Sequence, residues 1–267
     1  MPDFSRLDEI RARRPLVHCV SNIVSANDCA NLALAVGASP MMAHAAEEME
    51  DITAISSATV LNTGTPDAER FKVCLACGRA ANAAAQPLVL DPVGVGASPW
   101  RLAEIRRLLD AVRPDLLRVN LGEALALCHE AGREQGVDST LVAGRDQRIA
   151  AAGALAKLTG TSVLLTGEED VVHDGARVWL VQGGSALSGR VTGTGCMLSV
   201  LCGAFAAVEP DFAEAACLAS AFWKLCAERA ERASAGRGPG SFRTALFDAA
   251  YTIDCAQFAA RENILEL

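Results

Sequence analysis

Aromatic side chains are scarce in this sequence: its 267 residues include one Tyr and three Trp, and aromatic residues make up 4% of the chain. Hydrophobic residues still account for 51%, so a core must be built mainly from Ala, Val and Leu. Basic charge is also limited, with 24 Lys and Arg against 32 Asp and Glu and a formal net charge of −8. Proteins that bind the phosphate backbone of nucleic acids need a basic surface, so we expect no nucleic-acid partner.

Long hydrophobic runs are absent as well. The longest, residues 196–208, stops at Glu209-Pro210 and is shorter than the roughly 20 residues that cross a bilayer as a helix. The opening segment "MPDFSRLDEIRARRP" has no apolar stretch of the kind found in secretory signals. We therefore expect a cytoplasmic protein with no membrane partner, whose ten cysteines stay reduced.

Two common nucleotide-binding motifs are also missing. The sequence contains no G-x-x-x-x-G-K-[ST] loop, and its G-x-G segments at 94–96 and 193–195 lack the third glycine of a dinucleotide-binding loop. The one CxxC, from Cys74 to Cys77, has no second pair and no neighbouring His, which argues against a zinc site. Because it lies in a helical pattern, we interpret it as two buried helix thiols, with a redox dithiol as the alternative.

Short apolar segments that end in polar or turn residues alternate with helical stretches rich in Ala, Leu, Glu and Arg. We expect strands at 15–22, 58–64, 87–94, 115–120 and 161–167. Helices are expected between them, for example at 67–85 and 99–112. Apolar strands that alternate with amphipathic helices indicate an α/β fold with a mainly parallel sheet covered on both faces.

The last third of the chain departs from this alternation. Residues 170–184 predict two strands joined at the turn pair Asp174-Gly175. Beyond residue 195 the sequence predicts a helical C-terminal region, with helices at 195–208, 211–235 and 241–260. Since no repeat, linker or composition shift marks a boundary, we expect residues 1–267 to form one α/β domain.

Polar residues end the predicted strands, at the edge of the sheet where ligands of open parallel sheets bind. They are Asn22, Asn62, Asp91, Asn120, Glu123 and the run Thr166-Gly167-Glu168. Asp91 and Glu123 suit a Mg²⁺ site that works through water, but they equally suit a turn and the first turn of a helix. Arg118 lies inside an apolar strand, where its charge needs either an ion pair or a ligand phosphate.

The segment "VTGTGC", residues 191–196, directly precedes a predicted apolar helix. Glycine lets successive N–H groups turn toward one oxyanion, so the pattern suits an anion hole as well as it suits an ordinary helix start. Cys196 would lie in the first turn, where the helix dipole favours a thiolate; the alternative is a small buried residue. The sequence does not support covalent catalysis, because no protease signature contains any of its histidines, which are His18, His44, His129 and His173.

Taken in order, the motifs resemble the hydroxyethylthiazole kinase family, thiamine-salvage enzymes of the ribokinase-like superfamily. The matching segments, from about residue 15 to 243, are "PLVHCVSNIVSANDCANLALAVGASPMMAHA", "VLNTGT", "LDPVGVGAS", "RVNLGE", "LLTGEEDVV", "VTGTGCMLS" and "GPGSF". The resemblance implies a ribokinase-like fold and ATP-dependent phosphorylation of the primary alcohol of 4-methyl-5-(2-hydroxyethyl)thiazole, with Mg²⁺ as cofactor. It also implies a homotrimer with its sites between subunits.

On the acceptor side, the resemblance places Met42 at the thiazole-contacting methionine and Gly193 at the glycine beside the substrate hydroxyl. In the implied trimer, Met42 of one subunit lines the thiazole site beside the nucleotide-binding loop of a neighbouring subunit. The wider superfamily carries Asp where Cys196 stands. Because the hydroxyl loses its proton late in a loose transition state, we expect the anion hole at Gly193, Gly195 and Cys196 to supply most of the catalysis, with Cys196 a modest proton acceptor.

On the nucleotide side, the resemblance places Arg118, Asn120 and Thr166 at ATP-contacting positions. It places Asp91 and Glu123 at the acids that support Mg²⁺. For Asp91, Glu123 and Arg118, the sequence pattern alone is equally compatible with a purely structural role.

One departure from the family pattern bears on activity. Val119 stands where the family usually has Gly, and we expect it to add bulk beside the phosphates and to weaken nucleotide binding. Two alternatives therefore stay open. One is a kinase for another vitamin-precursor alcohol, such as hydroxymethylpyrimidine or pyridoxal, and the other is a non-catalytic protein that binds thiazole or nucleotide.

Overall fold

The computed structural model describes residues 2–129, 144–261 and 263–267. The strands in this part of the chain are β1 (Leu16–Val20), β2 (Ser39–Met41), β3 (Ala58–Asn62), β4 (Leu88–Asp91), β5 (Leu116–Asn120), β6 (Ser162–Thr166), β7 (Asp170–His173), β8 (Val178–Val181) and β9 (Ile264–Glu266). The α-helices are α1 (Arg6–Arg13), α2 (Ala26–Val36), α3 (Met49–Ile55), α4 (Ala68–Ala83), α5 (Pro99–Ala111), α6 (Leu121–His129), α7 (Arg145–Thr159), α8 (Thr194–Ala206), α9 (Phe212–Ala233), α10 (Pro239–Thr252) and α11 (Cys255–Ala259). Short 3-10 helices are η1 (Ala46–Glu48), η2 (Val95–Ala97) and η3 (Ala186–Arg190).

The described residues form a nine-stranded sheet in the order β2-β1-β3-β4-β5-β6-β7-β8-β9. Neighbouring strands from β2 to β6 pair in parallel, and β7, β8 and β9 continue the sheet antiparallel. The predicted strands and the hairpin at Asp174-Gly175 are confirmed, and so is the mainly parallel α/β sheet. The edge strands β2 and β9 were not predicted, because each is only three residues long.

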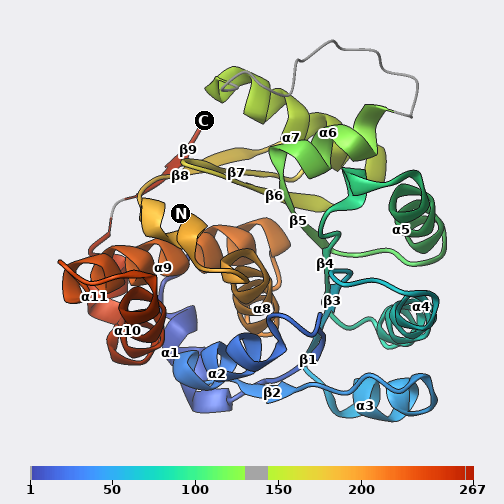
Figure 1. Ribbon diagram of the computed structural model, residues 1–267, viewed down its shortest axis with the longest axis horizontal. Helices are drawn as coiled ribbons and strands as arrows, with labels where there is room; N and C mark the ends of the chain where they lie inside the picture. Colours follow the sequence, from blue (N-terminus) through green and yellow to red (C-terminus); the bar gives the residue numbers. More distant parts are fainter. Residues whose placement is uncertain (1, 130–143, 262) are drawn as a thin grey trace.

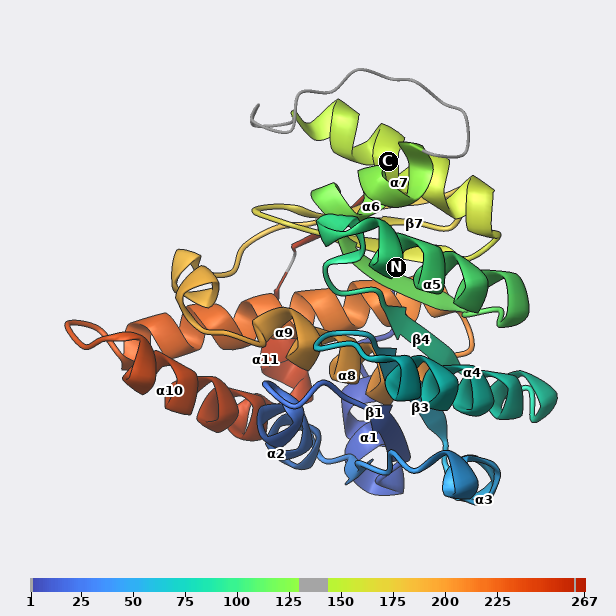
Figure 2. The ribbon, with the colours of Figure 1, turned by 45° about the vertical axis from the view of Figure 1, so that its right-hand side comes forward.

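Helices cover both faces of the sheet, as predicted (Figure 1). We call one side the α8 face: α2, α8 and α9 pack on its strands, and α1 and α10 pack on these helices. The other is the α4 face, which packs against α3, α4, α5, α6 and α7. In Figure 2 the long helix α9 runs lengthwise through the α8 side, with α10 packed beside it. Each face has its own buried apolar cluster, since alternate strand residues point to opposite sides.

Val119 belongs to the cluster on the α4 face, where it is fully buried with Leu117 and Leu165. Arg118, its neighbour in β5, points to the α8 face, where its guanidinium reaches Asp91. The expectation that Val119 adds bulk beside the nucleotide phosphates is therefore wrong. Alternation along the strand turns this side chain away from the polar edge and into the core.

Local capping explains where the C-terminal helices begin. The Asp211 side chain accepts the N–H groups of Ala213 and Glu214 at the start of α9. The predicted helix at 241–260 is instead two helices, α10 and α11. The chain is extended at Asp254, whose side chain forms a capping box with Gln257 and starts a new helix.

The ten cysteines all lie in the described residues, and none of them forms a disulfide. Cys74 and Cys77 lie buried in α4, and burial raises the pKa of Cys74 to about 12 and that of Cys77 to about 11. The interpretation of the CxxC as two buried helix thiols is confirmed. Over the described residues, none of the helices has the length and apolar character needed to cross a membrane.

The close approach of α8 to the sheet depends on Gly203. A Cβ at this position would lie 2.6 Å from Val60 Cγ2 and 3.0 Å from Val17 Cγ1, both on rigid strand residues. Branched valine side chains are stiff at χ1, and a close-packed core leaves little room for them to shift. Helix α8 can therefore lie this close to β1 and β3 only with glycine at its contact point.

We predict that Gly203→Ala lowers the free energy of unfolding by about 1–2 kcal/mol, because overpacking outweighs the better helix propensity of alanine. The control is Gly189→Ala, where an added Cβ meets nothing within 4 Å. Its effect should stay within about 0.5 kcal/mol. Urea unfolding followed by circular dichroism measures both, and equal stability of the two variants would contradict the close-packing argument.

Candidate active site

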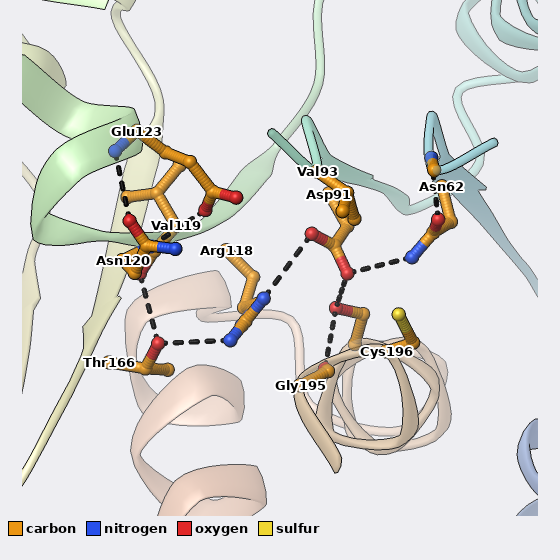
Figure 3. Close-up of polar contacts among 12 residues, drawn as sticks. Asn62, Asp91, Val93, Arg118, Val119, Asn120, Glu123, Thr166, Gly195 and Cys196 are labelled. Carbon is orange, nitrogen blue, oxygen red and sulfur yellow. Dashed lines mark hydrogen bonds and ion pairs between the residues drawn. The ribbon is translucent and has the colours of Figure 1, made fainter. Parts of the chain in front are cut away.

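Four neighbouring parallel strands each present a polar side chain on the α8 face near their carboxyl ends. They are Asn62 of β3, Asp91 of β4, Arg118 of β5 and Thr166 of β6. Asn62 and Asp91 are direct partners in the β3–β4 register, so their side chains lie side by side. The result is a polar row across the sheet edge that faces the start of α8 (Figure 3). The predicted positions of Asn62, Asp91 and Thr166 at strand ends are confirmed.

Asp91 lies at the centre of this row and is 0% exposed. Its carboxylate accepts from Asn62 Nδ2 at 2.9 Å and from Ser199 Oγ at 2.7 Å, and it pairs with Arg118 Nη1 at 3.3 Å. A buried carboxylate without such partners would be costly. Ser199 was missed by the sequence reasoning, although it follows Gly195 by four residues and therefore lies on the same face of α8.

Arg118 connects Asp91 to Thr166. Its Nη2 donates to Thr166 Oγ1 at 3.0 Å, while the side chain as a whole is only 12% exposed. Burial lowers the pKa of Arg118, but the carboxylates of Asp91 and Glu123 raise it further, so the net shift is upward and the guanidinium keeps its charge. Of the two alternatives left open for Arg118, the ion pair is present.

Gly195 is required by the approach of Arg118 to the start of α8. A Cβ at 195 would lie 2.4 Å from Arg118 Nη2 and 2.7 Å from Cζ. Gly193, the N-cap, has φ +82°, and a Cβ there would also meet Ser25 Cβ at 2.9 Å. No side chain caps this helix start, and its first turn contains no acidic residue. Backbone N–H groups at the positive end of α8 are therefore available to an anion, beside a buried guanidinium.

Cys196 follows in the first turn of α8 and is half-buried. Its Sγ accepts from Asn22 Nδ2 at 3.3 Å, and the same amide donates to Asn62 Oδ1 at 2.9 Å. Asn22 Oδ1 accepts the Ser25 N–H at 3.1 Å, which fixes the orientation of the amide because a backbone N–H can only donate. Through Asn22 and Asn62 the hydrogen bonds run without a break from Asp91 to Cys196.

Asn120 and Glu123 form a reciprocal cap at the start of α6. Glu123 Oε2 accepts the Asn120 N–H and Asn120 Oδ1 accepts the Glu123 N–H, both at 2.9 Å. Glu123 Oε1 also accepts the Gly94 N–H at 2.9 Å, which ties the loop after β4 to α6. Burial raises the pKa of Glu123, although the N–H groups of Gly94 and Asn120 act to lower it. The helix-start alternative for Glu123 is confirmed.

A pocket of about 890 Å³ opens beside the polar row. Arg118, Asn120, Thr166 and Gly195 all line it, so the structure brings the predicted nucleotide-contacting residues to one cavity. Its other walls are the β6–β7 turn, the segment from β8 to η3, and α9. From α9 comes Lys224, which the sequence reasoning missed; its only signal was a charged residue inside an apolar helix.

Met42 lies outside this network. It follows β2, the edge strand beside β1, and packs half-buried against the cluster on the α8 face. His18 is fully buried and its Nε2 lies 3.1 Å from the Ala43 carbonyl oxygen, so it supports the segment after Met42. His44 is exposed, and the side chain of His129 lies outside the described residues. In the described part of the chain, no group of three or more His, Cys, Asp or Glu residues is placed to hold a metal ion.

Two sequence comparisons match all or nearly all of the chain. A sequence profile described as "HK: Hydroxyethylthiazole kinase family" matches residues 7–256. A hydroxyethylthiazole kinase of Listeria monocytogenes serovar 1/2a is 42% identical over 266 residues, which cover 100% of this chain and 98% of the relative.

Solved structures give the same picture. The structure of a hydroxyethylthiazole kinase protein from Pyrococcus horikoshii OT3 matches with a TM-score of 0.90 and 36% identity, covering 99% of this chain and 98% of that chain. A ribokinase-like superfamily protein from Enterococcus faecalis V583 matches at 0.61 and 13% identity, over 96% of this chain and 95% of that chain, a likeness of fold alone. The predicted ribokinase-like fold is confirmed. From the profile match and the full-length identity, the chain belongs to the hydroxyethylthiazole kinase family.

Proposed function

We propose that this chain transfers the terminal phosphoryl group of ATP to the primary alcohol of 4-methyl-5-(2-hydroxyethyl)thiazole, a step of thiamine biosynthesis and salvage. Family membership along the full chain supports this substrate. The observation that carries the chemistry is the uncapped start of α8 beside the buried guanidinium of Arg118, at a pocket of about 890 Å³. That volume lies within the range of small-molecule sites.

The proposed mechanism relies on positioning and charge. Arg118, Asn120 and Thr166 bind the nucleotide from the pocket wall. The N–H groups of the first turn of α8, at Gly195 and Cys196, receive the negative charge that spreads over the transferred phosphoryl oxygens. In a loose transition state such pre-oriented donors stabilise the charge without reorganising during the reaction.

Mg²⁺ is part of the proposal, and the donor set suits a water-mediated ion. Asp91 already accepts three hydrogen bonds or ion-pair contacts, and Glu123 accepts two backbone N–H groups. A carboxylate offers about four lone-pair sites, so each acid can still accept a metal-bound water. Mg²⁺ commonly keeps several waters and binds through one or two carboxylates plus substrate phosphates. Bound there, it would neutralise phosphate charge, while Asp91 and Glu123 orient its waters.

Cys196 is the proposed proton acceptor for the substrate hydroxyl, with a modest share of the catalysis. The Asn22 amide donates to its sulfur and holds the side chain in one place. Gly193 at the helix start is the proposed neighbour of the hydroxyl, as its place in the family motif implies. A side chain at this position would also collide with Ser25.

For the thiazole-binding part of the site, we propose a homotrimer whose active sites lie between subunits. Met42 follows the edge strand β2, and in the proposed trimer it contacts the thiazole in the site of a neighbouring subunit. Exposure in the loop beside Asn22 supports an interface, since Ile23 is 78% and Val24 is 58% exposed. Light scattering of the purified chain measures the oligomeric state.

The proposal is tested by offering ATP with the thiazole alcohol, the hydroxymethylpyrimidine alcohol and pyridoxal in parallel and measuring ADP formation. Turnover with the thiazole alone is expected. Turnover with the pyrimidine or pyridoxal instead would favour the alternative vitamin-precursor kinase. Tight binding of thiazole without turnover would favour the non-catalytic alternative, which lost its main support when Val119 proved to face the core.

We predict that Cys196→Ala lowers kcat only about tenfold, below the usual range for loss of a general base. Gly195→Ala should lower it more than about 100-fold, because its Cβ displaces Arg118 from the anion site. Cys196→Asp should retain activity, since Asn22 Nδ2 can donate to a carboxylate. Steady-state kinetics, on variants whose circular dichroism spectra match that of the wild type, measure the loss of kcat in each variant. Equal losses for the alanine variants, or an inactive folded Asp variant, would contradict it.

For Val119→Gly, which restores the usual family residue, we predict a nucleotide KM within about twofold of the wild-type value. The free energy of unfolding should fall by about 2–4 kcal/mol, because a buried side chain is lost and the strand gains flexibility. Kinetics at a temperature where both proteins are folded, with urea unfolding alongside, separate the two effects. A several-fold drop in nucleotide KM would mean that the valine crowds the phosphates after all.

A further inference from the structure

Helix α9 carries three polar side chains at four-residue spacing in an otherwise apolar, buried stretch. They are Ser220, Lys224 and Glu228. Residues at this spacing lie on one face of a helix, one turn apart. Each of them bonds to a segment that lines the nucleotide pocket, so the face forms a polar strip along one wall. We call it the α9 strip.

Lys224 is the centre of the strip and is 7% exposed. Its Nζ donates to the carbonyl oxygens of Glu168 at 3.0 Å, Gly183 at 3.2 Å and Gly167 at 3.4 Å. It also pairs with Asp170 Oδ1 at 3.3 Å. These groups come from two turns far apart in the sequence, the one between β6 and β7 and the one after β8. A single ammonium therefore joins two walls of the pocket.

The peptide between Gly183 and Gly184 is held from both sides by the strip. Its carbonyl accepts from Lys224, and its N–H donates to Glu228 Oε1 at 2.9 Å. The C=O and N–H of a trans peptide point in opposite directions, so two contacts from one helix fix the plane of this unit. Both glycines have left-handed backbones, at φ +100° and +96°, and such a turn has many alternative conformations unless it is held.

The β6–β7 turn is held in the same way through Asp170. Its Oδ1 accepts the Gly167 N–H at 2.8 Å, and its Oδ2 accepts from Ser220 Oγ at 2.7 Å. Lys224 then binds the carbonyl of Gly167 and the Asp170 carboxylate together. Every charge in this buried cluster has a partner, which a buried ion pair requires.

We infer that Lys224 is a positioning residue for nucleotide binding: with Ser220 and Glu228 it holds the two turns at the separation that the nucleotide needs. The inference rests on the proposed function, which places ATP in this pocket. The strip bonds the pocket turns and makes no bond to Cys196 or Met42 among the described residues, so its effect should fall on the nucleotide and leave the thiazole alcohol unaffected.

The test is Lys224→Met, which keeps the length of the side chain and removes its donors. The dissociation constant of ADP, measured by calorimetry, and the KM for ATP should both rise about tenfold, which corresponds to roughly 1.4 kcal/mol. The KM for the thiazole alcohol should stay within about twofold. The control is Lys157→Met, an exposed position on α7 outside the pocket, which should change neither KM.

A second variant keeps the test valid if Lys224→Met fails to fold because Asp170 loses its partner. Asp170→Asn combined with Lys224→Met removes both buried charges, and we expect it to fold with the same weakened ADP binding. Unchanged ADP affinity in a folded variant, when the wild-type chain binds ADP, would overturn the inference and leave the proposed function standing. A wild-type chain that binds neither ADP nor ATP would overturn the proposed function and this inference with it.

Discussion

The fully buried carboxylate of Asp91 sets the geometry of the site, because each of its partners comes from a different element. Asn62 belongs to β3, Arg118 to β5 and Ser199 to α8. A buried charge that loses a partner is strongly destabilising, so the sheet and α8 must keep the relative position that satisfies all of these contacts. The uncapped start of α8 is therefore held in place by the same carboxylate that pairs with Arg118 beside it.

Close packing follows from that constraint. Arg118 comes near enough to α8 that a Cβ at 195 would displace its guanidinium, and α8 comes near enough to β1 and β3 that a Cβ at 203 would overlap Val17 and Val60. The pocket beside this contact is closed by turns with glycine backbones, which are ordered by Lys224 and Glu228 of α9. Phosphoryl transfer depends on such a rigid sheet edge and on hydrogen-bonded pocket turns, because its catalysis comes mainly from positioning and fixed charge.

Much of the fold was predictable because its signals are local. The parallel strands are short apolar runs with polar ends, and helices begin at side chains that cap them, as Asp211 does for α9. The break between α10 and α11 was missed, although Asp254 and Gln257 form a recognisable capping box, because the apolar pattern continues through it. At the site, Asp91 and Thr166 were indicated by their places at strand ends, and Arg118 by its charge inside an apolar strand.

The sequence by itself determined the family, the mainly parallel α/β sheet and the edge where polar groups gather, since these follow from motifs, periodicity and the ends of strands. Only the tertiary structure decided which partners those groups take. Val119 faces the core because β5 is covered on both sides, and Ser199 reaches Asp91 across 108 positions of sequence. Lys224 holds turns that lie 41 and 56 residues away. Contacts over such separations depend on how helices dock on the sheet, which no local pattern records.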